Sequence, residues 1–342
     1  MEGGRRLAIQ DALGRPLNDL RISVTDRCNF RCVYCMPKEV FGPSFAFLPR
    51  KELLTFEEIT RLARIFSGLG VHKLRITGGE PLVRHNIEAL IGHLSMIPDI
   101  DDIAMTTNGS LLTAERARTL KAAGLSRVTI SLDSLDETRF QAINEVGFPV
   151  QRVLAAIDHA LNADLHPVKV NMVVKRGVND QDILPMAQYF RGRGVILRFI
   201  EYMDVGTANG WRLDDVVPAE EILTQISAVW PLASLPPKRP GDVARRFRYE
   251  DGQGEIGIIS SVSQPFCQGC SRARLSPEGQ LYLCLFGERG MDLRSLVRSD
   301  ASDAAIASHI QSIWLNRRVR YSEERTEATS KRPRVEMFRI GG

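Results

Sequence analysis

The 342-residue sequence contains no long apolar run, and its charges nearly balance. No uninterrupted apolar stretch approaches the roughly 20 residues that a helix needs to cross a bilayer. The formal net charge of +4 is small for this length, so it does not indicate a nucleic-acid partner, although it suits a small anionic substrate. We therefore expect a globular protein that binds neither a membrane nor a nucleic acid.

Histidine and cysteine are both scarce, but only the histidines are scattered, without any ligand-like spacing between them. The six cysteines fall into two triplets: Cys28, Cys32 and Cys35 near the start, and Cys267, Cys270 and Cys284 near the end. The first ten residues, MEGGRRLAIQ, contain no apolar signal segment, so we expect a cytoplasmic protein with reduced thiols. Disulfide bonds are therefore not expected between these cysteines.

Three cysteines per site suit an iron–sulfur cluster better than a structural zinc ion. Structural zinc normally takes four protein ligands, and no histidine lies within either triplet. A zinc site would therefore have to take a distant fourth ligand, and this remains the alternative. A cubane of four irons held by three thiolates leaves one iron open. The two triplets thus predict two [4Fe–4S] clusters, each able to bind a further molecule.

Short β-type runs alternate with helical segments between residues 19 and 201. The β-type runs are 20–25, 73–77, 102–107, 127–132, 168–174 and 195–200. The helical segments begin at Thr55, with Glu58 completing a capping box, and continue at about 85–95, 113–123, 151–163 and 181–192. Six successive β–α units imply a parallel sheet.

Polar motifs follow four of these β-type runs directly, at the end where α/β sheets and barrels bind ligands. They are Thr25–Cys28, Thr77–Glu80, Thr107–Gly109 and Ser131–Asp133. We therefore expect an α/β fold with a curved, partial (βα)6 TIM-like barrel over residues 1–201, rather than a flat doubly wound sheet. Beyond residue 201 the alternation fades, and a β-like stretch at 255–260 and helical segments at 292–299 and 302–316 remain. Residues 202–342 are expected to form an α+β appendage that closes the open side of the barrel.

The stretch 20–37, LRISVTDRCNFRCVYCMP, resembles the radical S-adenosylmethionine (SAM) enzymes. Gly78–Pro81 is similar to the glycine-rich SAM-binding motif of that superfamily. The resemblance implies that the first three cysteines hold a [4Fe–4S] cluster whose open iron is chelated by SAM. The reduced cluster would then cleave SAM to a 5′-deoxyadenosyl radical.

Three further motifs resemble the GTP 3′,8-cyclase family of molybdenum cofactor biosynthesis: 266–286 (FCQGCSRARLSPEGQLYLCLF), 106–109 (TTNG) and the final Gly–Gly. The resemblance extends from about residue 17 to the last glycine. It implies a lyase that removes the C3′ hydrogen of GTP, joins C3′ to C8 and yields 3′,8-cyclo-7,8-dihydro-GTP. The second cluster would face the guanine base through its open iron.

The same resemblance implies roles for individual residues. SAM contacts would come from Tyr34, Gly79, Ser131 and Met203. GTP contacts would come from Arg21, Arg75, Thr106, Lys169, Arg272, Ala273 and Arg274, with Thr107 as the alternative to Thr106. Arg272 or Arg274 would assist the last reduction or protonation, and the Gly341–Gly342 tail would reach into the active site. Glu80 is a possible partner of the SAM amino group, while Trp211 and Phe266 are expected to serve packing.

The resemblance also implies partners: a low-potential reductant such as flavodoxin or ferredoxin, the downstream cyclic pyranopterin monophosphate synthase, and a second copy of the chain in a homodimer. Two rivals remain open on the sequence. One is a peptide-modifying radical SAM enzyme with an auxiliary cluster. The other is an electron-transfer protein with two fully coordinated clusters.

Overall fold

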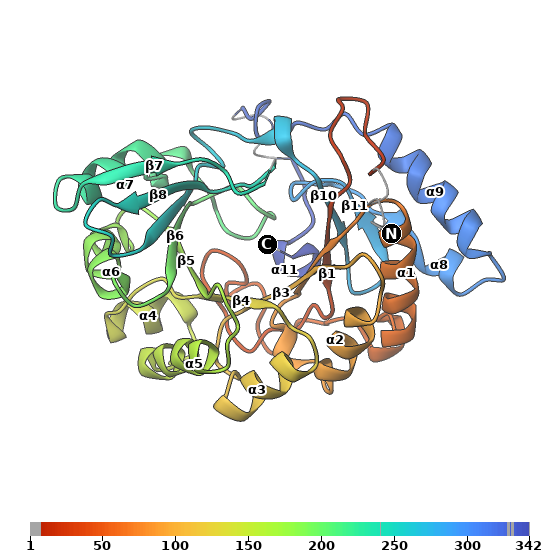
Figure 1. Ribbon diagram of the computed structural model, residues 1–342, viewed down its shortest axis with the longest axis horizontal. Coiled ribbons are helices and arrows are strands. Elements are labelled where there is room, and N and C mark those ends of the chain that lie inside the picture. Colours follow the sequence, from red (N-terminus) through yellow and green to blue (C-terminus); the bar gives the residue numbers. More distant parts are fainter. Residues whose placement is uncertain (1–7, 240, 327–328, 330–331, 342) are drawn as a thin grey trace, which may run out of the picture.

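A computed structural model describes residues 8–239, 241–326, 329 and 332–341, and within them one curved sheet of twelve strands (Figure 1). The order across the sheet is β12-β11-β10-β1-β2-β3-β4-β5-β6-β9-β8-β7. The strands of the first part of the chain are β1 (Asp19–Ser23), β2 (Lys73–Thr77), β3 (Asp102–Thr107), β4 (Arg127–Ser131), β5 (Lys169–Val174) and β6 (Ile196–Glu201). The later strands are β7 (Leu232–Leu235), β8 (Arg245–Tyr249), β9 (Glu255–Ile259), β10 (Arg272–Leu275), β11 (Gln280–Tyr282) and β12 (Met291–Asp292).

The helices of the β–α units lie outside the curve of the sheet (Figure 1). They are α1 (Phe56–Gly68), α2 (Ile87–Ser95), α3 (Ala114–Ala122), α4 (Glu137–Asn144), α5 (Val150–Asn162) and α6 (Ile183–Phe190). The later helices are α7 (Ala219–Ser227), α8 (Arg294–Val297), α9 (Asp303–Leu315) and α11 (Met337–Ile340). The capping box of α1 is confirmed, because Thr55 and Glu58 exchange side-chain to backbone hydrogen bonds. Within the described ranges, no helix combines the length and apolar character that crossing a membrane requires.

The partial α/β barrel that the sequence predicts is confirmed, and all six predicted strands are present within two residues of the expected bounds. Three of the described helices were missed: α4, α7 and the short α11. The C-terminal part also enters the barrel sheet, since β10 pairs in parallel with β1 and β9 pairs in parallel with β6. Eight parallel strands therefore run from β10 to β9, with antiparallel strands at each edge.

The two faces of the sheet differ in character. In β1, Leu20 and Ile22 are fully buried in the main hydrophobic core, whereas Asp19 and Arg21 face the other way. Since side chains alternate along a strand, every second residue points inside the barrel. Parallel strands usually read as apolar on both faces, because helices cover both. Polar residues on the inner face therefore indicate a ligand cavity rather than a packed barrel centre.

Candidate active site

Strand register brings the polar inner residues of neighbouring strands side by side. Arg21 of β1 lies between Arg75 of β2 and Arg274 of β10. Lys169 of β5 lies opposite Thr129 of β4, and Asn171 lies beside Arg198 of β6 in the same way. Six strands thus present cationic or polar side chains on the inner face of the sheet.

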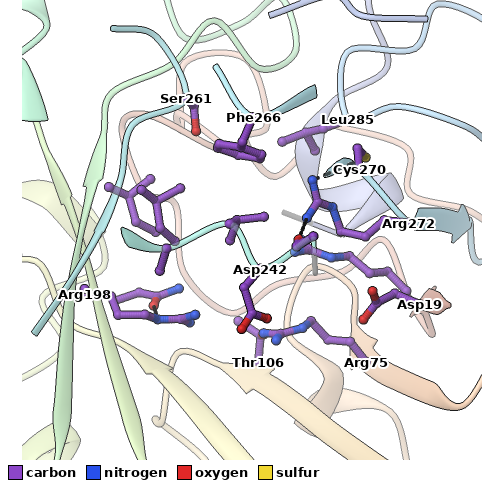
Figure 2. A pocket seen from close by; sticks show the side chains of 18 of the residues that line it. Asp19, Arg75, Thr106, Arg198, Asp242, Ser261, Phe266, Cys270, Arg272 and Leu285 are labelled. Atoms are coloured by element: carbon purple, nitrogen blue, oxygen red, sulfur yellow. Dashed lines mark hydrogen bonds between the residues drawn. The ribbon is translucent and has the colours of Figure 1, made fainter. Parts of the chain in front are cut away.

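These side chains line a cavity of about 220 Å³ (Figure 2). Among the described residues, ten Lys or Arg side chains but only three Asp or Glu side chains line the cavity, so it is strongly cationic. Figure 2 shows Arg75, Thr106 and Arg198 on one side, and Phe266, Cys270 and Leu285 on the other. The cations are Arg21, Lys73, Arg75, Arg127, Lys169, Arg198, Lys238, Arg246, Arg272 and Arg274.

The pKa values of several cavity cations are depressed because burial and mutual repulsion both disfavour their charged forms. Burial, together with the charges of Arg198, Arg127 and Arg75, lowers the pKa of Lys169 to about 6. Burial and neighbouring arginines lower the pKa of Arg198 to about 9, and burial lowers the pKa of Arg75 to about 10. The pKa of Arg21 also falls well below its usual value, first through burial and then through Arg274. A polyanion in the cavity would relieve this repulsion.

Local contacts aim the arginines at the cavity. Arg75 donates from Nη1 to Thr106 Oγ1 at 3.1 Å. Arg198 donates from Nε to Asn171 Oδ1 at 2.9 Å. Gly257, its partner on β9, leaves room for the Arg198 side chain, since a Cβ at position 257 would lie 3.0 Å from Arg198 Cγ. Thr107 instead donates to Glu80 Oε1 at 2.7 Å and does not line the cavity. Of the two threonines, Thr106 is therefore the one placed to contact a ligand there.

The second cysteine triplet forms part of the cavity wall, and Cys267, Cys270 and Cys284 all line it. Cys267 begins a short 3-10 helix (Cys267–Gly269) before β10, and Cys284 follows β11. Burial alone would raise the pKa of Cys270, but the charges of Arg272 and Arg317 lower it to about 6. Their guanidinium groups donate to Cys270 Sγ at 3.3 Å and 3.0 Å. This environment favours a thiolate, which is the form that binds iron.

The first triplet lies in the loop after β1. Cys32 O accepts the backbone N–H groups of Cys35 and Met36 at 2.9 and 2.8 Å, so the loop curls into a single tight turn. The Gly79 backbone packs directly on this loop, because a Cβ at Gly79 would lie only 2.3 Å from Arg27 O. Met36 and Phe41 form a small apolar cluster with Phe338 against Cys28 and Cys35.

Of the residues expected to contact SAM, Tyr34 belongs to the loop of the first triplet and Gly79 packs on that loop. Tyr34 donates to Asp133 Oδ2 at 2.7 Å, and burial raises the pKa of Asp133 to about 6. Glu80 is fully buried, and burial raises its pKa to about 7 although it accepts bonds from Thr107, Leu82 and Asn108. Ser131 ends β4, whereas Met203 follows β6 and lines the cavity. Two buried carboxyls at this edge suit the ammonium and hydroxyl groups of a nucleoside amino acid such as SAM.

The C-terminal tail lies inside the sheet, where α11 packs against β1 (Figure 1). Arg274 donates to the carbonyl oxygens of Ile340, at 3.1 Å, and of Gly341. Gly341 is buried with a φ of 70°, and a Cβ there would lie 2.2 Å from Thr77 Cγ2. The penultimate glycine therefore fits a space closed to larger residues. Gly342 lies outside the described residues, and Ala273 is buried in the main core.

Each triplet supplies three free thiols, the donor set that would leave one iron of a [4Fe–4S] cluster open. Among the residues that the structure describes, no three His, Cys, Asp or Glu side chains are grouped to bind a single metal ion. A zinc ion draws its sulfurs to about 2.3 Å from one centre, whereas an iron–sulfur cluster spreads its thiolates over several irons. The hydrogen bonds to the sulfurs of Cys28 and Cys270 also match the donors that tune such clusters.

Several cavity residues were not singled out from the sequence. Lys73, Arg127 and Arg198 share the inner face with the predicted contacts, and a strict count of every second strand residue would have found Lys73. Phe266, assigned to packing, lines the cavity with the Arg272 guanidinium 5.3 Å from its ring centroid.

Comparison with known proteins agrees with this geometry. The chain matches the model of the Radical SAM superfamily over residues 22–190 and that of Molybdenum Cofactor Synthesis C over residues 195–323. The crystal structure of Streptococcus suis SuiB bound to S-adenosylmethionine is similar at a TM-score of 0.61, covering 87% of this chain and 68% of that one. At 13% identity, this likeness shows the fold alone. The chain is thus a radical SAM enzyme, which uses SAM and iron–sulfur chemistry.

Full-length relatives define the family. The GTP 3′,8-cyclase of Acidothermus cellulolyticus is 57% identical over 321 residues, which cover 93% of this chain and 88% of that protein. The GTP 3′,8-cyclase of Staphylococcus haemolyticus is 48% identical over 338 residues, with 98% and 99% covered. The chain belongs to the GTP 3′,8-cyclase family. This membership sets aside the peptide-modifying and electron-carrier alternatives.

Proposed function

We propose that this protein converts GTP to 3′,8-cyclo-7,8-dihydro-GTP, the first step of molybdenum cofactor biosynthesis. The observation that carries the proposal is the cationic cavity, which has Cys267, Cys270 and Cys284 in its wall and the C-terminal tail bonded to its Arg274. Cys28, Cys32 and Cys35 would hold the first cluster, which together with bound SAM would supply a 5′-deoxyadenosyl radical. The remaining work of recognition and shielding falls to the chain's own residues.

The triphosphate is proposed to bind among the inner strand cations. Arginine forks pair with phosphate oxygens at two points, and Arg21, Arg75 and Arg198 come from three different strands. Burial and the surrounding positive charge depress the pKa of Lys169, and an anion bound here would offset both effects. Thr106, already bonded to Arg75, would take a phosphate or ribose oxygen.

The guanine base is proposed to face the second triplet. Phe266 and Leu285 give this side of the cavity an apolar wall, while Arg272 lies between Phe266 and Cys270 (Figure 2). Arg274 points to the buried tail and holds the carbonyl of Gly341. We assign Arg272 or Arg274 to assist the closing reduction or protonation at the base, and the Gly341–Gly342 tail to reach into the active site.

Tyr34, Gly79, Ser131 and Met203 are proposed to hold SAM at the end of the strands where the first triplet lies. Gly79 fixes the strand-end backbone against the cysteine loop, and Tyr34 is oriented by Asp133. The tail and the apolar cluster of Met36, Phe41 and Phe338 would keep water from this end.

The two parts of the chain are proposed to have different functions. We propose that residues 1–201 generate the radical and that residues 202–342 hold the second cluster and close the site. A flavodoxin- or ferredoxin-type reductant, delivery of product to cyclic pyranopterin monophosphate synthase, a homodimer and a cytoplasmic location remain predictions.

The deciding experiment incubates the anaerobically reconstituted, reduced protein with SAM and GTP and analyses the products by mass spectrometry. The proposal expects 5′-deoxyadenosine together with a cyclised nucleotide of GTP mass. A reaction with CTP in place of GTP is the control, since CTP carries the same triphosphate but no guanine C8. Deoxyadenosine without any change in GTP would leave a radical enzyme with another substrate and overturn the proposal.

A further inference from the structure

A buried arginine that the sequence analysis did not single out contacts the second cysteine loop at several points. Arg317, which is 3% exposed, donates to Cys270 Sγ at 3.0 Å and to Cys270 O at 2.8 Å. It also donates to the carbonyl oxygen of Leu283, the residue before Cys284, at 3.2 Å. One guanidinium therefore joins the two chain segments that carry the second triplet.

Two further buried groups fix this guanidinium in place. Asp11 Oδ2 accepts from Arg317 at 3.0 Å and from Arg15 at 2.7 Å. Arg15 in turn donates to Cys267 O at 3.0 Å. The ring of Trp314 lies 4.5 Å below the Arg317 guanidinium, and its indole N–H donates to Arg15 O at 3.2 Å.

The charge balance of this group points toward a bound anion. Asp11 supplies one carboxylate for two buried guanidinium groups, and Arg15 Nη2 has no hydrogen-bond partner. A buried excess of positive charge is costly unless negative charge lies beside it. Cys270 Sγ lies beside the Arg317 guanidinium. A cluster held by Cys270 and the two other thiolates would provide the compensating negative charge.

We propose that Arg317 is a positioning residue for the second cluster, which holds its two ligand segments together and stabilises its reduced form through the bond to Cys270. A cationic donor to a ligand sulfur favours the state with the additional electron, because hydrogen bonds and nearby charge set the potential of such clusters. Arg317 thus acts through Cys270 and does not touch GTP. This inference rests on the second cluster of the proposed function.

The test compares Arg317→Gln and Arg317→Lys with Arg318→Gln, the exposed arginine next in sequence. All are made in full-length protein with Cys28, Cys32 and Cys35 changed to alanine, so that iron and electron paramagnetic resonance (EPR) signals report only the second site. Arg317→Gln is expected to shift the reduction equilibrium toward the oxidised form by about tenfold, which is about 59 mV for one electron. Arg317→Lys should shift it less, since it keeps the charge, and Arg318→Gln should leave it unchanged.

An unchanged midpoint potential in Arg317→Gln with a full complement of iron would overturn the inference. Loss of iron in Arg317→Gln that Arg317→Lys restores, with native circular dichroism in both, would support it. If Arg317→Gln does not fold, the potential of Arg317→Lys decides, and a wild-type value there would count against the bond to Cys270. If the triple-alanine parent protein holds no iron at this site, the second cluster of the proposed function is contradicted, and this inference is overturned with it.

Discussion

The two cysteine sites of this chain differ in what holds them and in the charge around them. The first is a local turn whose carbonyl groups are held by Arg31, which donates to Cys28 O and Phe30 O at 2.7 and 2.8 Å. Its sulfur contacts are neutral, since Cys28 Sγ accepts from Phe30 N at 3.4 Å and from Asn108 Nδ2 at 3.8 Å. The second is assembled from distant segments, with Arg272 and Arg317 donating to Cys270 Sγ.

The titration of the thiols follows this difference. Burial and the nearby Glu80 carboxyl raise the pKa of Cys28 to about 12, whereas arginine charges bring that of Cys270 down to about 6. An apolar, anion-bearing setting resists the addition of an electron, and a cationic one favours it. On the proposed function, the surroundings of the first site therefore suit a strongly reducing cluster, and those of the second suit a cluster that is more easily reduced.

The two sites should differ most clearly in function when a single ligand cysteine is removed from each. Cys28→Ala should abolish 5′-deoxyadenosine, because the site that binds SAM is lost. Cys270→Ala should abolish the cyclised nucleotide but retain deoxyadenosine, because the first site stays intact. Mass spectrometry of both products in each variant distinguishes the two outcomes, and equal loss of deoxyadenosine in both would show that the sites are not separable in function.

The first site also depends on a close backbone contact of Gly79. Gly79→Ala should cost most of the iron at the first triplet, because the added Cβ would lie 2.3 Å from Arg27 O, which is backbone and cannot rotate away. Gly92→Ala is the matched control, since a Cβ there meets nothing within 4 Å. Iron content and the response of the EPR spectrum to SAM measure the effect. Full SAM response in Gly79→Ala would mean that the loop can shift and that this contact is not what requires glycine.

Reduction potentials give the third and more graded contrast. Among the described residues, cationic side chains donate to a cysteine sulfur only at the second site. The second cluster should therefore be the more easily reduced, by about tenfold or more in equilibrium constant, or about 59 mV. Potentiometric titration followed by EPR in the two triple-alanine backgrounds measures each cluster alone. A first cluster with the higher potential would contradict the electrostatic account of both sites.

The same contrast explains how much the sequence could reveal. The strands of the first part and the cysteine spacing follow local patterns, so the barrel and the first turn are predictable from residues close in sequence. The contacts of Arg317 with the second site are not predictable in this way, since Asp11 and Arg317 lie 306 positions apart and meet only after folding. The pairing of β10 with β1, which puts Arg274 beside Arg21, is likewise a tertiary event without a local signal. Gly79 was noticed as a glycine, but its neighbour, the carbonyl of Arg27, required the structure.

The smallest expected effect concerns a single proton at the substrate end of the cavity. Burial and cationic neighbours hold the pKa of Lys169 at about 6, so this amine is mostly neutral at pH 7.5 before GTP binds. Bound triphosphate would raise that pKa, so GTP binding should take up as much as one proton, and Lys169→Met should remove this uptake. Calorimetry of GTP binding in two buffers of different ionisation enthalpy measures it, with SAM binding as the control.

The effect of Lys169 on how the free energy of unfolding changes with pH can be tested in the same protein. A lowered folded-state pKa means that the unfolded chain binds the additional proton between about pH 6 and the ordinary lysine value of 10.5, so without GTP this residue makes stability rise with pH across that window. GTP should flatten that rise, because the bound anion restores the charge of Lys169 in the folded state. Thermal unfolding at several pH values, with and without GTP, follows both trends. An equal slope in wild type and Lys169→Met would show that the amine is already charged and that the empty cavity tolerates its full positive charge.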